Sequence, residues 1–464
     1  GDSVTAFLAP TPRGPIDRAV EIASFQDFER IFDLPDSFCR LAGVLRDFFA
    51  NGGTNALVVR VSGSNQRARM CLPGPAGGLV LEARNPGAAE FLRAAVDYDG
   101  IEPSSYNSFN LVLQRLREPD SPWIESQECF RRVSIEPTSR DYVGYVLNQS
   151  QIATLVNEAP PARPHATCET GILQQPNYVN GDLPHIDAAC PTDYDLIGSE
   201  QSGTGLNALE HVPDIGQVCL LTDSDSGPGP VALLAADSFC RRHQALLLID
   251  PPACWQSVED VLNDQAHAAF SSPNSMTWFP NLETRRTQHE YRQIASALGA
   301  VAAGLVAASR SSVKLLETRP VLLRGADARL EIAIEQSDAQ RLRRAGINSL
   351  RQISPLHLEL NGNITLARNE GLAAESHDLD GRCQTLFILR RIRQATQWTL
   401  FHESSPHYWQ ELTEQIGVFL AELHARSMLA GPHHSQAYDV KCDRDTNRDK
   451  IGATGEFTFV VGFE

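Results

Sequence analysis

The pattern Gly203-Thr-Gly205-Leu-Asn-Ala208 is the first candidate for chemistry in this sequence. It imitates the glycine-rich turn with which dinucleotide-binding proteins hold a pyrophosphate at a helix N-terminus. The residues before it are polar, so the preceding strand that this motif needs is not indicated. No acidic residue closes a strand about 20 residues later, where a ribose would be bound. We therefore interpret the segment as a turn that begins a helix.

A second candidate is Asp443-Arg-Asp-Thr-Asn-Arg-Asp449, where carboxylate and amide oxygens alternate as they do in a calcium-binding loop. Arg448 stands where that loop requires glycine, and Thr454 stands where it requires a bidentate glutamate. Two arginines would also repel a cation. The pattern predicts a polar loop that satisfies its own backbone groups, not a metal site.

Four histidines near the C-terminal end could be proposed as zinc ligands: His402, His407, His433 and His434. None follows the helical spacing His-x-x-x-His, in which three residues including a glutamate lie between the two histidines. Pro406 also interrupts the run. We interpret these histidines as solvated or packed side chains.

Asp250-Pro-Pro252 follows an apolar stretch that predicts a strand, and α/β enzymes often place chemistry at such strand ends. The alternative is that Asp250 caps a turn stiffened by the prolines. The sequence has no Gly-x-Ser-x-Gly elbow and no phosphate loop. We predict no catalytic, cofactor-binding or metal-binding residues, no cofactor and no enzymatic activity.

The composition is that of a compact globular chain, with 464 residues, 42% hydrophobic and 21% charged. This length predicts two to four domains. The net charge of -17, from 57 acidic and 40 basic residues, disfavours a nucleic-acid partner. The stretch 294–308 is apolar but shorter than the roughly 20 residues that cross a bilayer, so we predict a buried helix and no membrane insertion. No secretory signal is visible, which predicts synthesis in the cytoplasm.

The cysteines show no Cys-x-x-Cys pair and no crowding of the kind found in small disulfide-rich domains. We expect most of them to be small buried hydrophobic residues. The alternative is that some form disulfides between subunits in an oxidising exterior. The ten positions are 39, 71, 129, 168, 190, 219, 240, 254, 383 and 442.

Periodicity and turn residues divide the chain into three stretches. The first predicts a strand at 3–9, a helix begun by Ser24, a helix at 37–50 ended by Asn51-Gly52-Gly53, and a strand at 56–61. After a boundary at 63–78 come four strands, 79–83, 91–98, 109–116 and 127–133, then a helix at 140–147 and a long loop at 160–194.

The third stretch alternates helices with apolar strands, which predicts a partly parallel sheet covered by helices. Its elements are helix 203–211, strand 218–222, helix 231–243, strand 245–250, helix 257–268 and strand 276–279. A helix at 290–309 has small side chains that permit close packing. Further on we predict strands at 346–351, 358–367 and 399–401, helices at 386–398 and 408–425, and a closing strand pair at 438–442 and 457–461.

The order and separation of several short blocks resemble the tail sheath proteins of contractile bacteriophages and related contractile injection systems. The blocks at the two ends of the chain are Val4 to Pro15, Ser24 to Phe32, Phe48 to Gly53, Ala56 to Val61, Gln397 to Phe401 and Ala437 to Asn447. Those between them are Leu81 to Gly87, Gly205 to Glu210, Leu248 to Ala253 and Ala345 to Asn348.

This resemblance implies a mixed α/β, multi-domain fold. It predicts a discontinuous domain of residues 1–62 plus 345–464, an inserted β-rich segment at 79–150 and an inserted α/β domain at 190–344. Sheath subunits also carry terminal arms that add strands to the sheets of neighbours. Because this chain runs from Gly1 to Glu464 without such extensions, we expect an arm-trimmed core.

The function that the resemblance implies is mechanical. Sheath subunits stack as hexameric rings around an inner tube and contract on a baseplate signal, which drives the tube through a target envelope. Expected partners are neighbouring subunits, the inner tail tube, the baseplate and the tail terminator, in a phage tail or an injection particle. The acidic excess would suit basic patches on the tube or on adjacent subunits. The alternatives are a non-contracting tail or baseplate component and an α/β nucleotide-binding enzyme.

Overall fold

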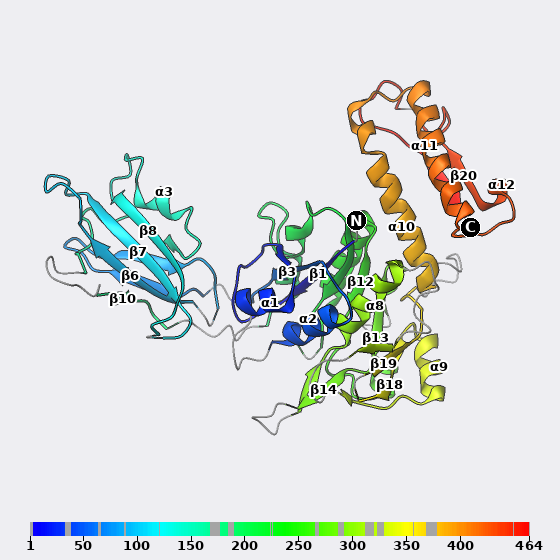
Figure 1. The fold of residues 1–464 in the computed structure, drawn as a ribbon, viewed down its shortest axis with the longest axis horizontal. Helices are drawn as coiled ribbons and strands as arrows, with labels where there is room; N and C mark the ends of the chain where they lie inside the picture. The colour runs from blue at the N-terminus through cyan, green and yellow to red at the C-terminus, as the bar shows by residue number, and fades with distance from the viewer. Residues whose placement is uncertain are drawn as a thin grey trace.

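The structure of the protein is a computed structural model with three bodies along its long axis: a β-sandwich, a central α/β body and a C-terminal lobe (Figure 1). It describes residues 3–32, 39–63, 66–87, 90–119, 121–167, 177–183, 190–222, 224, 226–264, 269–285, 292–310, 320–322, 329–355, 357–367, 378–448 and 450–463. Predicted positions that lie outside these ranges are 37–38, 64–65, 168–176, 184–189, 265–268 and 290–291.

The central body is built on a nine-stranded sheet. Its strands are, in order, β16 (Pro320–Leu322), β19 (His357–Asn361), β18 (Asn348–Ser354), β13 (Ser275–Phe279), β12 (Leu246–Ile249), β11 (Ile215–Leu220), β1 (Val4–Ala9), β3 (Ala56–Arg60) and β2 (Val20–Ile22). Neighbours are parallel from β18 to β3 and antiparallel at both edges. The predicted partly parallel sheet is therefore confirmed.

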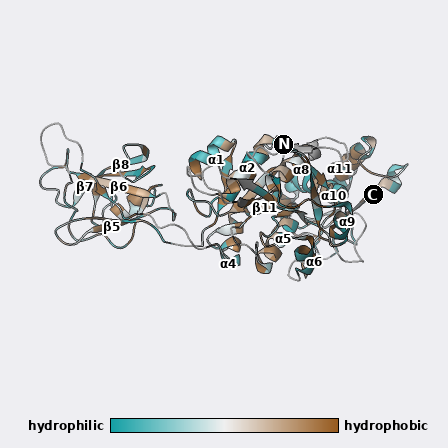
Figure 2. Ribbon diagram, turned by 90° about the horizontal axis from the view of Figure 1, so that it is seen from below, coloured by the Kyte–Doolittle hydropathy of each residue, from teal (hydrophilic) through white to brown (hydrophobic). Residues whose placement is uncertain are grey.

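Helices cover both faces of this sheet, which is why its inner strands are apolar on both sides. Phe7 and Leu248 face a layer made by α1 (Phe25–Ile31), α2 (Arg40–Ala50) and α8 (Leu298–Arg310). Leu8 and Leu247, one residue along each strand, face the opposite layer. That layer contains α4 (Asp193–Ile197), α5 (Pro230–His243), α6 (Val258–Asn263) and α9 (Gln336–Arg344). In Figure 2 the helices α5 and α6 carry both hydrophobic and hydrophilic residues, as helices between core and solvent do.

Local rules place the helix ends of the first segment as predicted. The Ser24 hydroxyl accepts a hydrogen bond from the Asp27 backbone N–H at 3.2 Å and caps α1. Helix α2 ends at Ala50 and is capped by Asn51, and Gly52 follows with a φ of 89°, in the left-handed region that glycine adopts readily.

The helix predicted at 290–309 is shorter than expected. Residues 292–295 form strand β15 (Arg292–Ala295), which pairs with β14 (Leu282–Arg285) in a small sheet completed by β17 (Arg329–Leu330). The Ser296 hydroxyl then accepts the Leu298 backbone N–H at 3.0 Å, so a polar side chain starts α8 and ends the strand. Most of α8 is buried, and no helix in the described ranges is long and apolar enough to span a membrane.

The small side chains of α8 permit close packing, as predicted, and at Gly299 the helix packs closely against α2. A Cβ atom at this position would lie 1.7 Å from the carbonyl oxygen of Val44 in α2. Glycine is therefore the residue that allows these two backbones to touch.

The sandwich confirms the strand pattern predicted after residue 78. One sheet has the order β10 (Val179–Asn180), β6 (Phe91–Asp97), β7 (Ser108–Leu116) and β8 (Ile124–Ser134). The other has the order β4 (Arg69–Leu72), β5 (Leu79–Ala83) and β9 (Ala153–Leu155), and α3 (Val143–Leu147) packs nearby. The two sheets share a core of their own, which includes Leu81, Leu111 and Val143.

The C-terminal lobe consists of α10 (Leu379–Ala395), α11 (Pro406–Ala425), α12 (His434–Ala437) and the antiparallel strands β20 (Tyr438–Lys441) and β21 (Val460–Phe463). The closing strand pair is confirmed, but its second strand is Val460–Phe463 and not the predicted 457–461. The strand predicted at 399–401 is wrong, because Gln397–Phe401 is the 3₁₀ helix η3. The Thr399 hydroxyl donates to the Thr396 carbonyl at 2.8 Å, which continues the winding of the chain after α10.

The sheet connectivity differs from the predicted division of the chain. Strand β1, in residues 1–62, pairs with β11 of the predicted separate domain 190–344. Strands β18 and β19 join the same sheet at a distance, through β13. Residues 379–463 form the lobe, and its buried side chains from Ile388 onward form clusters apart from the sheet. Leu379 and Leu386, in the first half of α10, pack instead in the core of the central body. A parallel neighbour is reached by a crossover of about a dozen or more residues with no fixed upper length, so strand patterns alone do not show which segments share a sheet.

Candidate functional site

The glycine turn at 203–205 is occupied by a side chain of the protein itself. Gly203 and Gly205 have φ angles of 62° and 56°, and Gly205 begins the 3₁₀ helix η1 (Gly205–Leu209). The Gly205 backbone N–H donates to the Asp17 carboxylate at 2.9 Å. The predicted helix-starting turn is thus confirmed, with a carboxylate where a dinucleotide-binding protein would place a phosphate.

Asp250 lies at the end of β12, and its carboxylate is taken up by contacts within the core. The Arg40 guanidinium lies 2.7 Å away, with the two side chains 9% and 4% exposed, and the Ser296 hydroxyl donates to the same carboxylate. Burial raises the pKa of Asp250, and Arg40 and Ser296 offset part of that rise. The contacts join β12, α2 and the start of α8, so Asp250 organises the core instead of capping a turn.

The loop at 443–449 satisfies its own backbone, as predicted, and its last residue lies outside the described ranges. The Asp443 carboxylate accepts the backbone N–H groups of Asp445 at 2.9 Å and Thr446 at 3.1 Å. The Asn447 amide donates to the Thr458 carbonyl at 2.8 Å and thereby ties the loop to the chain before β21. The oxygens that could have bound calcium therefore hold a turn.

The four histidines fall into two separate groups. His402 and His407 lie against Tyr408, with ring centroids 4.5 and 5.2 Å from it. His433 and His434 lie instead at the start of α12. Within the described ranges no three metal-ligating side chains come together.

The cysteines divide between the core and the surface, contrary to the expectation that most are buried. Burial raises the pKa of the Cys219 and Cys240 thiols well above the ordinary value, and that of Cys383 to about 12. Cys442 is buried and Cys39 partly buried, whereas Cys71, Cys129, Cys190 and Cys254 are exposed. Cys71 and Cys129 are on the solvent side of sandwich strands, where alternation points every second residue outward. Cys168 lies outside the described residues.

The lobe contains the structural feature best suited to assembly. Strands β20 and β21 pair with each other, and no other described strand joins their sheet. Each strand therefore presents an open edge, and an open edge can receive a strand from another chain. The lobe also presents Leu400 and Phe401, which are 60% and 83% exposed.

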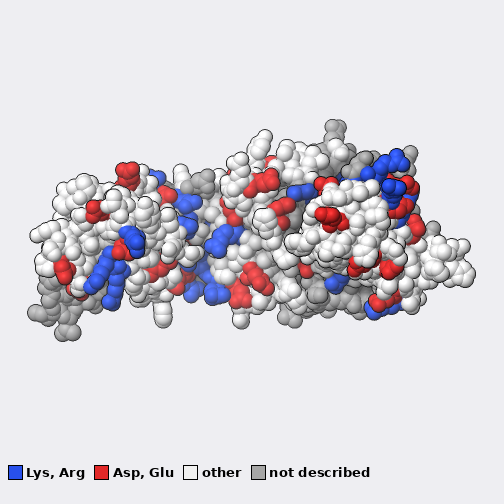
Figure 3. Space-filling view, turned by 90° about the horizontal axis from the view of Figure 1, so that it is seen from above, with Lys and Arg blue, Asp and Glu red and all other residues white. Residues whose placement is uncertain are grey.

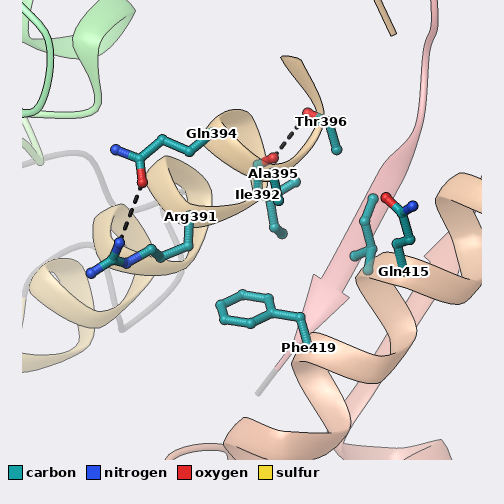
Figure 4. A pocket seen from close by; sticks show the side chains of 8 residues that line it. Arg391, Ile392, Gln394, Ala395, Thr396, Gln415 and Phe419 are labelled. Atoms are coloured by element: carbon teal, nitrogen blue, oxygen red, sulfur yellow. Dashed lines mark hydrogen bonds between the residues drawn. The ribbon is translucent and has the colours of Figure 1, made fainter. Parts of the chain in front are cut away.

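A cleft of about 390 Å³ lies between α10 and α11 (Figure 4). Its polar side chains are largely engaged locally: Arg391 donates to Gln394 at 3.4 Å, and Thr396 donates to the Ile392 carbonyl at 2.9 Å. Ile416 and Phe419 line the opposite wall. This lining holds no paired acid and base or nucleophile, so it offers no constellation for catalysis.

The sheet covered on both faces, the inserted sandwich and the lobe define a multi-body α/β protein. No protein-family model and no curated protein matches the sequence. The structure is similar to the crystal structure of the sheath tail protein from Listeria innocua, with a TM-score of 0.58 and 14% identity over 99% of this chain and 94% of that one.

Two assemblies contain chains of the same fold. A chain of the anti-feeding prophage baseplate has a TM-score of 0.53 and 14% identity over 99% of this chain and 88% of its own length. A chain of the PVC sheath complex, an extracellular contractile injection system in the contracted state, has a TM-score of 0.51 and 13% identity, with coverages of 99% and 87%. The resemblance to sheath proteins found in the sequence is thus confirmed for the fold.

Proposed function

We propose that the protein is the structural subunit of a contractile tail sheath. In this role it polymerises as stacked hexameric rings around an inner tube and contracts to drive the tube through a target cell envelope. The observation that carries the proposal is the likeness to a sheath tail protein over 99% of the chain, through all three bodies. A sheath needs no bond-making residues, and in this proposal the protein is not an enzyme.

The division into bodies supports a mechanical role. The central body, the sandwich and the lobe each have their own clusters of buried apolar side chains. Such bodies can keep their internal packing while the contacts between them, or between copies, are exchanged. Contraction would then be a rigid-body switch of interfaces.

The open edges of β20 and β21 are the proposed points of linkage between copies. An isolated two-stranded sheet is marginally stable, and here α11 supports it. Strands added from neighbouring subunits would complete the sheet through main-chain hydrogen bonds. Such links would let subunits rotate and slide while they stay connected.

Neighbouring sheath subunits are therefore the principal partners in this proposal, and the baseplate is the second, since a chain of this fold occurs in a baseplate assembly. The inner tube and the tail terminator complete the set. The net charge of -17 would favour basic surfaces on these partners. We place the protein in a phage tail or injection particle that is assembled after synthesis in the bacterial cytoplasm.

Electron microscopy of the purified protein tests the proposal. A sheath subunit should form striated tubes or polysheaths, whereas a non-contracting tail or baseplate component should form discrete rings or remain monomeric. The enzyme alternative predicts that nucleotides raise the melting temperature. Because Asp17 already accepts the backbone N–H at the glycine turn, we expect nucleotides to leave that temperature unchanged.

A further inference from the structure

The sandwich meets the central body at a narrow junction (Figure 1). Loop 10–17 of the central body faces the turn at 85–87 and the adjoining ends of β7 and β8. The apolar cores do not continue across this junction, because the buried residues of the sandwich form a cluster separate from both layers of the central sheet. On the face drawn in Figure 3, Lys and Arg side chains gather at the waist between the two bodies.

Arg60 fixes the central-body side of the junction. It is fully buried at the end of β3, where its guanidinium donates to the Thr11 carbonyl at 3.0 Å and to the Gly14 carbonyl at 2.7 Å. Its own carbonyl accepts the Asp17 backbone N–H at 2.9 Å. The loop is thus held in one shape before it meets the sandwich.

Alternating charges then cross the junction. Arg13 of the loop donates to the Arg30 carbonyl of α1 at 2.7 Å and forms an ion pair with Glu125 of β8. Arg115 of β7 lies 3.5 Å from Glu125 and 3.7 Å from Glu90, which is 2% exposed. Of these pairs, Arg13–Glu125 joins the two bodies, and Arg115 and Glu90 continue the row of partly buried and buried ions within the sandwich.

The turn at 85–87 of the sandwich packs closely against loop 10–17 of the central body. Gly87 has a φ of 130°, and a Cβ atom there would lie 2.6 Å from the Arg60 guanidinium and 2.8 Å from the Pro12 carbonyl oxygen. Any side chain at Gly87 would push the two bodies apart.

We propose that this junction is an ionic joint that sets the orientation of the sandwich on the central body and can be released without unfolding either one. An ion pair that is largely removed from water adds little net stability, because desolvation offsets most of its attraction, and in this proposal its role is to fix the geometry of the junction. The joint can therefore open at small cost, because its charges regain water when the two bodies separate. Burial raises the pKa of Glu90, and the charges of Arg115 and Arg60 offset part of that rise. The carboxylate of Glu90 is therefore held in the joint at a cost in desolvation.

The test compares Gly87→Ala and Glu125→Gln with two matched controls. Gly77→Ala places a side chain at a similar φ of 103° in the sandwich, but with no atom within 4 Å. Arg69→Gln removes the exposed ion pair with Glu82, 3.6 Å long and internal to the sandwich. Small-angle X-ray scattering of the monomeric fraction reports the separation of the bodies, and circular dichroism reports that the variants are folded.

We expect both junction variants to lengthen the maximum dimension and broaden the distance distribution, and both controls to match the wild-type protein. High salt should move the wild-type protein in the same direction but by less than either junction variant, because partly buried ion pairs are screened less than exposed ones. If Gly87→Ala does not fold, the scattering of Glu125→Gln alone tests the proposal. Folded junction variants whose scattering matches the wild-type curve at every salt concentration would overturn the proposal.

Discussion

The Arg40 guanidinium lies 2.7 Å from the Asp250 carboxylate, and this ion pair is buried between α2 and the end of β12. Asp250→Asn would leave Arg40 as an uncompensated charge in the core. We expect the free energy of unfolding to fall by about 3–5 kcal/mol, measured by urea denaturation.

Two comparisons make this prediction specific. The double variant Arg40→Met, Asp250→Leu should lose less than Asp250→Asn alone, because neither charge remains buried. Glu359→Gln, which removes the exposed pair of Glu359 with Arg351 on neighbouring strands, should cost less than about 1 kcal/mol. Equal losses for Asp250→Asn and Glu359→Gln would contradict the buried-pair interpretation.

The contact at Gly299 predicts that Gly299→Ala changes stability in the direction opposite to helix propensity. Alanine normally stabilises a helix relative to glycine, but at Gly299 its Cβ would overlap the Val44 carbonyl. We expect Gly299→Ala to destabilise the protein by about 1–3 kcal/mol in the same denaturation experiment. Gly417→Ala in α11, where no atom lies within 4 Å, should instead stabilise by about 0.5–1 kcal/mol. Stabilisation by both substitutions would show that α2 and α8 are not in contact at Gly299.

The burial of His243 predicts that the stability of the protein depends on pH. Burial lowers its pKa, although Glu210 at 3.5 Å offsets part of that shift, and its ring stacks on Phe239. The unfolded chain then binds the proton more readily than the folded chain. This contribution to stability is therefore complete above the unfolded pKa of about 6.5 and is lost as the pH falls toward the lowered folded value.

His243→Asn should flatten that part of the curve of melting temperature against pH. The exposed His407→Asn serves as the control and should keep the wild-type slope below pH 6.5. An unchanged slope in His243→Asn would exclude His243 as its source.

The open edges of the β20 and β21 pair predict a defect confined to assembly. Successive residues of a strand direct their N–H groups to opposite sides. Of the two single variants Val460→Pro and Val461→Pro, one therefore removes a donor toward β20 and the other removes a donor on the outer edge of β21. We expect the variant that loses the outer-edge donor to keep the wild-type melting temperature of the monomer and to form no sedimentable polymer. If the variant with an intact monomer polymerises as the wild-type protein does, this edge does not link subunits.

Features governed by neighbouring residues could be predicted from the sequence. The Ser24 cap, the stop at Gly52 and the self-satisfied loop at Asp443 depend on contacts within a few residues. The helix expected from residue 290 was too long because Ser296, a single hydroxyl in an apolar stretch, ends a strand there. Apolar composition alone did not separate strand β15 from helix α8.

Features that join distant segments could not be predicted. No local sequence signal marks the pairing of β1 with β11, because the crossover between parallel strands has no fixed upper length. The ionic joint was missed for the same reason: Arg13 and Glu125, 112 residues apart, belong to no motif. The order of sheath-like blocks pointed to the overall fold without showing these contacts.

The most direct test of the sheath proposal is a cryo-electron microscopy reconstruction of the polymer. The account predicts a helical array of stacked six-fold rings in which the sheet of β20 and β21 is extended by strands of adjacent subunits. A protein that remains monomeric under all assembly conditions, or a polymer in which both edges of that sheet face solvent, would contradict it.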